Sequence, residues 1–203
     1  MSKFRTLAAL LVAAVLATHA HAQENCSRHL PLGELPGANQ VFCYQGYAVG
    51  YSHGLKIPLW AAYRLSNESA NGANVDRQDD FRMNSEVPLE HSSTTADYRG
   101  SGYDRGHMAP SGSIDFSAAA NSETFFLSNM VPQRPGFNRD GFGHEGVWGF
   151  LENEVRDWVR ERDEIYVISG AIASGQNTIG EGVAVPEAFY KIVIDLQEAE
   201  SIA

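Results

Sequence analysis

The sequence has few of the features that mark membrane proteins or proteins that coat nucleic acids. The apolar run near the N-terminus is too short to span a bilayer, and no later run is long enough. Lys and Arg number 15 against 25 Asp and Glu, so the formal net charge is −10. Non-specific nucleic-acid binders are expected to carry a basic face, so this balance leaves room only for a small cationic pocket. Repeats, linkers and low-complexity tracts are also lacking, which favours one domain.

Cysteine is scarce, and its scarcity limits metal chemistry. The only two cysteines are Cys26 and Cys43, so no second pair exists to complete a zinc site of the four-cysteine type. In an exported protein, oxidising conditions favour a disulfide between them that ties down the N-terminal arm. The alternative is two free, buried thiols.

The N-terminus predicts export. Lys3 and Arg5 precede an apolar run from Leu7 to Ala17, and Ala20-His21-Ala22 is a small-x-small cleavage pattern. We therefore expect a signal peptide at residues 1–22 and one mature domain at 23–203, secreted or periplasmic and free of the membrane after cleavage. Loss of Lys3 and Arg5 takes the formal charge from −10 to −12, because the signal holds no acidic residue.

Apolar periodicity divides the chain into a few strands and one clear helix. The pattern predicts a helix at 148–162 and strands at 40–51, 55–65, 124–131, 165–172 and 188–196. Residues 66–102 and 133–146 are rich in polar residues and glycine, and we expect both to be irregular. The last strand ends close to the C-terminus, which predicts an exposed sheet edge there.

The most informative stretch is Asp104-Arg105-Gly106-His107. Arg offers a planar fork of donors that matches phosphate oxygens, and His titrates near neutrality and takes a proton from water. Gly permits a tight bend or close approach to a ligand, and Pro110 forbids a regular helix just beyond. We therefore expect the four residues on a short, rigid connection. The alternative is an ordinary surface turn.

A second feature lies on the predicted helix. At helical spacing Glu152 falls on the edge of an apolar stripe made by Trp148, Leu151, Val155, Trp158 and Val159. An ionised carboxylate there is costly unless it is paired or meets a metal. The alternative is a glutamate that reaches solvent or bonds to an arginine.

Together these residues suit hydrolysis of a phosphodiester. His107 would act as general base on water, and Arg105, helped by Arg77 from the irregular segment, would offset charge on the phosphate.

A divalent cation would complete such a site. Mg²⁺, with Mn²⁺ as a possible substitute, takes oxygen ligands and keeps most of its waters, so one amide oxygen is sufficient. This agrees with the lack of an Asp/Glu cluster. Asn138 is the best candidate ligand, Glu152 would bond a metal-bound water, and Asn129 would orient the site.

The chain resembles the non-specific DNA/RNA endonucleases, the ββα-metal nucleases that include the Serratia-type enzyme and endonuclease G. The resemblance runs from about residue 41 to 196. Its matching residues are Asp104-Arg105-Gly106-His107-Met108-Ala109-Pro110, Leu127-Ser128-Asn129-Met130-Val131-Pro132-Gln133, Phe137-Asn138, Trp148 and Leu151-Glu152, with Tyr51 and Pro58-Leu59-Trp60-Ala61-Ala62-Tyr63 upstream.

The resemblance implies a fold and an activity. The fold would be α+β, the ββα-metal (His-Me finger) endonuclease fold, with a mostly antiparallel central sheet and flanking helices. The activity would be hydrolysis of DNA and RNA with little base preference, leaving 5′-phosphate ends. The resemblance also implies a catalytic His107, a metal ligand at Asn138, a phosphate-binding Arg105, a metal-water carboxylate at Glu152 and a second catalytic arginine at Arg77.

The chain also departs from the family pattern. Residues 139–147 lengthen the step from Asn138 to the helix, which could displace Asn138 or bring His144 and Glu145 near the metal. A zinc hydrolase using His107, His144 and Glu145 or Glu152 is therefore a competing hypothesis.

A third hypothesis is non-enzymatic. The family normally continues with more β structure, so the chain could be C-terminally truncated. It would then be an inactive relative that binds nucleic acid or a partner protein. No pattern predicts an oligomeric state.

Overall fold

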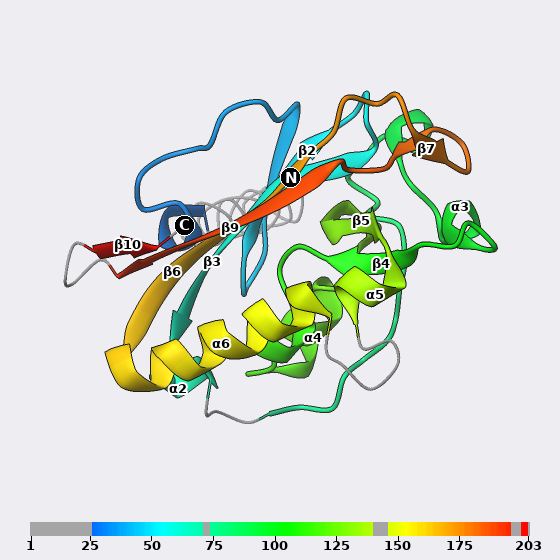
Figure 1. Cartoon of the computed structure of the whole chain (residues 1–203). Coiled ribbons are helices and arrows are strands. Elements are labelled where there is room, and N and C mark those ends of the chain that lie inside the picture. Colours follow the sequence, from blue (N-terminus) through cyan, green and yellow to red (C-terminus); the bar gives the residue numbers. More distant parts are fainter. Residues whose placement is uncertain (1–25, 71–73, 140–145, 196–199, 203) are drawn as a thin grey trace, which may run out of the picture.

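The computed structural model describes residues 26–70, 74–139, 146–195 and 200–202 (Figure 1). The predicted signal peptide therefore lies outside the described residues. The main element is a six-stranded sheet in the order β1-β2-β3-β6-β9-β10, in which every neighbouring pair is antiparallel. Its strands are β1 (Gln40–Cys43), β2 (Ala48–Ser52), β3 (Ile57–Ser66), β6 (Glu164–Ile172), β9 (Ala188–Asp195) and β10 (Glu200–Ile202). This confirms the expected α+β class with a mostly antiparallel sheet.

Helices and small β-pairs occupy the rest of the described chain. The long helix is α6 (Val147–Arg162), within one residue of its predicted start. The short helices are α2 (Asn67–Ala70), η1 (Leu89–His91), α3 (Thr95–Tyr98), η2 (Ser111–Ser113), α4 (Ala118–Glu123), η3 (Leu127–Asn129) and α5 (Pro135–Asn138). Two further β-pairs are β4 (Asp104–His107) with β5 (Met130–Gln133) and β7 (Thr178–Ile179) with β8 (Val183–Ala184). Across the described ranges, no helix has the length and apolar character needed to cross a membrane.

The segment predicted as one strand at 40–51 is in fact two strands. The chain reverses between β1 and β2, where the Tyr44 N–H donates to the Tyr47 carbonyl at 2.8 Å. A Cβ at Gly46 would lie 2.2 Å from Cγ2 of Ile114, so the turn fits only because glycine is there. That contact comes from a distant part of the chain. Local periodicity therefore did not reveal the turn.

Pro58 sits near the start of β3, as its lack of an N–H requires. It lies opposite Tyr51 beside an irregularity in the β2–β3 register. Pairing of β3 with β6 begins only at Trp60, so the missing N–H breaks no bond of that ladder.

The strand predicted at 124–131 is displaced along the chain. Thr124 and Phe125 form a turn, and Phe126 makes an isolated bridge with Arg82. The helix η3 follows, and β5 begins at Met130 and includes Pro132. β5 pairs only with β4, so its other edge needs no donor and tolerates proline. The C-terminal prediction also needs correction, because β10 pairs with β9 and covers the edge that was expected to be exposed.

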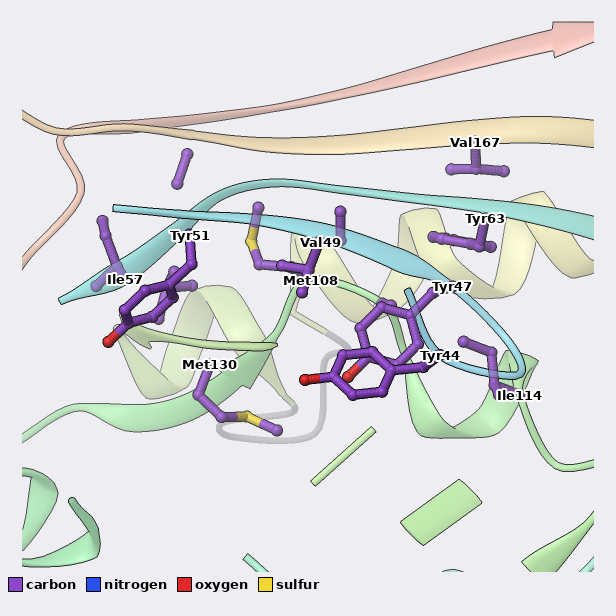
Figure 2. Packing of buried hydrophobic residues seen from close by; sticks show 14 of the residues in the cluster. Tyr44, Tyr47, Val49, Tyr51, Ile57, Tyr63, Met108, Ile114, Met130 and Val167 are labelled. Atoms are coloured by element: carbon purple, nitrogen blue, oxygen red, sulfur yellow. The ribbon is translucent and has the colours of Figure 1, made fainter. Parts of the chain in front are cut away.

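An apolar cluster packs on each face of the sheet. On one face Trp60, Tyr166 and Ile168 pack with Leu30 of the N-terminal segment. The other face carries the larger cluster, in which Met108 and Met130, next to β4 and within β5, pack beneath the strands (Figure 2). The small β4–β5 pair is therefore fastened to the core through apolar side chains, and its position relative to the sheet is fixed.

Cys26 and Cys43 form the predicted disulfide, with 17 residues of sequence separation. The bond joins the N-terminal segment to the end of β1. The alternative of two free thiols is wrong.

We expect the double substitution Cys26→Ser/Cys43→Ser to lower the free energy of unfolding by about 3 kcal/mol, because the unfolded chain regains the entropy of a closed loop of this size. Urea titration under oxidising conditions measures the change. Wild-type protein in excess reductant is the matched control and should lose a similar amount. A loss below about 1 kcal/mol in both samples would contradict a stabilising role for the cross-link.

Candidate active site

The Asp104–His107 motif forms strand β4 and not the expected short connection. It pairs in antiparallel register with β5, and alternation along the strand puts Arg105 and His107 on one face. Gly106 is needed for close packing and does not form the predicted bend. A Cβ at this position would lie 2.1 Å from Oε1 of Gln133 on the facing strand. The motif is thus rigid, as predicted, because it belongs to a sheet.

Arg105 and His107 open onto a hollow of about 400 Å³. We call it the catalytic hollow. It brings together five of the six residues that sequence analysis singled out, from four separate parts of the chain. Its lining comprises Arg77, Arg105, His107, Pro110, Ser111, Gly112, Asn138, Arg139, Glu152 and Arg156.

The imidazole of His107 is held in an aromatic and largely dry setting. The residue is 9% exposed, and its ring meets Phe125 edge-on at 5.0 Å between centroids and Phe81 at 5.9 Å. Trp148 at the start of α6 donates from Nε1 to the His107 carbonyl at 3.2 Å. Burial, followed by the positive charges of Arg77 and Arg105, lowers the pKa of His107 from 6.5 to about 3. The ring is therefore neutral in the free protein at neutral pH.

The two predicted arginines flank this histidine. The guanidinium of Arg105 lies over the Phe81 ring at 3.9 Å, and that of Arg77 lies 4.7 Å from the Phe125 centroid. Arg77 also donates to Oγ of Ser111 at 2.6 Å, which ties the irregular segment to the turn after β4. Both cations are thus held beside His107 by aromatic faces.

Asn138 lies at the end of α5, and its orientation is set by β4. Its Nδ2 donates to Oδ2 of Asp104 at 3.0 Å, and Arg139 forms a two-pronged pair with the same carboxylate at 2.7 and 3.2 Å. Burial alone would raise the pKa of Asp104, but these bonds outweigh it and the pKa is lowered. Because Nδ2 is engaged, Oδ1 is the amide atom left to face a ligand. The lengthened step after Asn138 has not removed it from the catalytic hollow.

Glu152 reaches the catalytic hollow from α6, and its side chain is partly buried. Arg156, one helical turn further on, lines the same wall and donates to Oγ of Ser113 at 3.3 Å. Sequence analysis did not single out Arg156. Its spacing of four residues from Glu152 places both on one side of the helix and was the available signal.

Asn129 does not reach the catalytic hollow. It is fully buried, and its side chain bonds both backbone groups of Ala109: Oδ1 accepts from the N–H at 2.9 Å and Nδ2 donates to the carbonyl at 2.9 Å. Nδ2 also donates to the carbonyl of Thr124 at 2.9 Å. Asn129 therefore fixes the chain just after His107 and does not itself face a ligand.

The donor set suits a hard cation. The catalytic hollow offers an amide oxygen at Asn138 and a carboxylate at Glu152, which are ligand types that Mg²⁺ accepts directly or through water. Within the part of the chain that the structure describes, no three His, Cys, Asp or Glu side chains gather closely enough to hold a metal. A zinc site would have to draw on His144 and Glu145, which lie outside the described residues.

A β-pair that presents a histidine against a helix carrying a carboxylate defines the class of ββα-metal nucleases. The chain belongs to the DNA/RNA non-specific endonuclease family, whose model matches residues 30–202. This family assignment agrees with the resemblance carried by the sequence motifs.

Individual relatives support the same assignment. A nuclease of Nostoc sp. is 35% identical over 184 residues, covering 86% of this chain and 64% of the relative. Human mitochondrial endonuclease G is 35% identical over 172 residues, covering 79% of this chain and 56% of its own length. The chain thus spans less than two thirds of either protein. In the crystal structure of the EndoG/EndoGI complex, which concerns EndoG inhibition, a chain superimposes with a TM-score of 0.77 at 32% identity, covering 87% of this chain and 76% of that one.

The depressed pKa of His107 predicts how stability depends on pH. In the unfolded chain the ring protonates near 6.5, whereas in the folded protein it stays neutral down to about 3. Neutral His107 therefore contributes its full stabilisation of the folded state above pH 6.5. This contribution is lost as the pH falls towards 3, by up to about 1.4 kcal/mol per pH unit for one proton. Burial likewise lowers the pKa of His29, to about 4, so both histidines act with the same sign.

We expect His107→Gln to make the free energy of unfolding fall less steeply with acid than in the wild type, since one of these two buried rings is removed. Urea titrations at a series of pH values between about 4 and 7 measure the slope. A wild-type slope retained by the variant would show that native His107 takes up protons in this range.

Proposed function

We propose that this protein is a metal-dependent endonuclease that hydrolyses phosphodiester bonds of DNA and RNA without preference for the sugar. The observation that carries the proposal is that His107 and Asn138, from different elements, line one hollow together with Glu152 and several arginines. Family membership supports the reaction class.

In this proposal His107 is the general base. Its Nε2 is buried without a hydrogen-bond partner among the described residues, so we assign Nδ1 as the atom that takes a proton from the attacking water. The ring is neutral and ready to accept. The positive charges of Arg77 and Arg105 contribute to the low pKa of His107. A phosphate bound between the two arginines would offset these charges and so raise the pKa of His107.

Arg105 and Arg77 bind the scissile phosphate in this scheme. A guanidinium keeps its charge at any relevant pH and presents paired donors to phosphate oxygens. The aromatic faces of Phe81 and Phe125 already hold both groups in place, so little further ordering is needed as negative charge grows on the phosphate.

Asn138 and Glu152 would hold the cation, which we propose to be Mg²⁺ with Mn²⁺ as a substitute. When bound, such an ion polarises phosphate oxygens and stabilises the leaving oxygen. Asn138 would supply Oδ1 as the direct ligand, and Glu152 would orient a water of the ion. Asp104, held by Arg139, keeps the Asn138 amide turned the right way.

We also propose that the protein acts in an oxidising compartment, in the periplasm or outside the cell. The Cys26–Cys43 disulfide supports this, because such bonds are rare in reducing cytosol. The basic and apolar N-terminal segment expected to direct export is consistent with it.

The test is digestion of plasmid DNA and of RNA in Mg²⁺, with and without EDTA, by wild-type protein and by His107→Ala. We expect EDTA to stop both reactions and His107→Ala to slow them by about 10²–10⁴-fold, the usual contribution of a general base. His53→Ala removes an imidazole that does not line the catalytic hollow, and is the matched control.

Two results would overturn the proposal. Cutting by His107→Ala at the wild-type rate would show that His107 is not the general base. Undiminished cutting in excess EDTA would show that the reaction does not depend on a metal ion. Saturable binding of DNA without any cleavage in Mg²⁺ would instead favour the inactive binding protein.

A further inference from the structure

A second hollow adjoins the catalytic hollow and shares a residue with it. It measures about 410 Å³ and is lined by Thr95, Tyr98, Arg99, Tyr103, Asp104 and Arg105. Arg105 belongs to both walls. Anything bound between Arg99 and Arg105 would therefore lie directly beside a group in the catalytic hollow.

Neither arginine of this second hollow forms a salt bridge with a described carboxylate. Most described arginines pair with a carboxylate, namely Arg64, Arg77, Arg82, Arg139, Arg160 and Arg162. Among the residues that the structure describes, neither Arg99 nor Arg105 has such a partner. Arg99 is exposed, and the guanidinium of Arg105 lies over the face of Phe81, which does not use its N–H donors. Both thus keep donors available for an anion.

The one carboxylate in the wall does not neutralise them. Asp104 is already engaged by the fork of Arg139 and by Nδ2 of Asn138. Burial alone would raise the pKa of Asp104, but these hydrogen bonds and the positive charges of Arg139 and Arg105 lower it, so the carboxylate is ionised. Its salt bridge is with Arg139, which leaves the two positive charges of Arg99 and Arg105 against this one shared negative charge. The net charge offered by the second hollow is therefore positive.

The position of Arg99 is fixed by a rigid connection. Arg99 follows helix α3, whose capping Asp97 accepts from Thr94 at 2.7 Å and from the Glu181 N–H at 2.7 Å. The chain then reverses through Gly100 and Gly102, with φ of +69° and +81°, a conformation that favours glycine. This reversal returns the chain to β4, which keeps Arg99 and Arg105 on the same hollow.

The line of unpaired cations continues beyond Tyr103. That residue also lines a third hollow of about 460 Å³, which contains Arg134 and Phe137. Arg134 is exposed and has no carboxylate partner within the described ranges. The two hollows that Tyr103 lines therefore each contain an arginine without a carboxylate partner among the described residues, although the third hollow also contains Glu187.

We propose that the second hollow is a phosphate subsite, in which Arg99 together with Arg105 binds the backbone phosphate of the nucleotide next to the scissile bond. This inference rests on the proposed nuclease function and specifies its substrate as a chain with at least two phosphates. Every nucleotide of a strand carries one phosphate, so a strand whose scissile phosphate lies in the catalytic hollow has further phosphates on both sides of it. The second hollow begins at Arg105, on one of those sides. The subsite reads no base, since arginine contacts to phosphate carry no sequence information.

The experiment compares Arg99→Gln with Arg28→Gln, which removes the same charge from an exposed arginine next to Leu30 of the opposite sheet face. Cleavage is measured on long single-stranded DNA and on bis(4-nitrophenyl) phosphate, which has a single phosphate. We expect Arg99→Gln to lower kcat/KM on DNA about tenfold, as loss of one charge-assisted hydrogen bond implies, and to leave the small diester unchanged. Arg28→Gln should change neither.

Binding of a labelled single-stranded oligonucleotide in EDTA gives a readout that needs no catalysis. The slope of log K against log salt should become shallower by about 0.7 in Arg99→Gln, the value for one lost phosphate contact on a single strand. The subsite is wrong if Arg99→Gln matches Arg28→Gln in both assays, or if it slows the small diester as much as DNA. Failure of wild-type protein to cut either substrate would refute the nuclease function alone, because the binding slope still decides the subsite.

Discussion

The buried amide of Asn129 holds the segment on which the candidate site depends. It bonds both backbone groups of Ala109 and reaches the carbonyl of Thr124, so the strand carrying His107 and the turn beside it cannot shift separately. Buried amides of this kind are costly when unpaired and rigid when satisfied. Met108 and Met130 then fasten the same unit to the large sheet (Figure 2). Geometry in the catalytic hollow is therefore set from within the core.

The charged residues are distributed so that this acidic protein still offers a small site for an anionic ligand. Carboxylates pair with more than half of the described arginines, including Arg77 and Arg139 of the catalytic hollow, whereas Arg99 and Arg105 have no carboxylate partner among the described residues. The acidic remainder discourages general adhesion to nucleic acid, since counterion release scales with the number of phosphate contacts. A chain of net charge −10 can thus act on a polyanion through a few well-placed cations.

The residues of the candidate site could be predicted from the sequence more accurately than the positions of the strands and turns. Arg105, His107, Asn138 and Glu152 could be singled out because their functional groups lie in short motifs, and the structure places all four on one hollow. The turn at Gly46 could not be predicted, because the contact that demands glycine comes from Ile114. The extent of β5 was also predicted wrongly, because a proline inside a strand normally removes a hydrogen bond of the ladder. Pro132 is accommodated because β5 pairs only with β4, a contact that comes from another part of the chain.

The sheet also separates the molecule into two sides with different uses. The disulfide and the N-terminal segment cover one face around Trp60, while the catalytic hollow and the second hollow are built from elements that pack on the other face. A fluorophore or a solid support attached near Arg28 would therefore leave the approach of a long polymer unobstructed. The molecule could in this way be immobilised in a defined orientation.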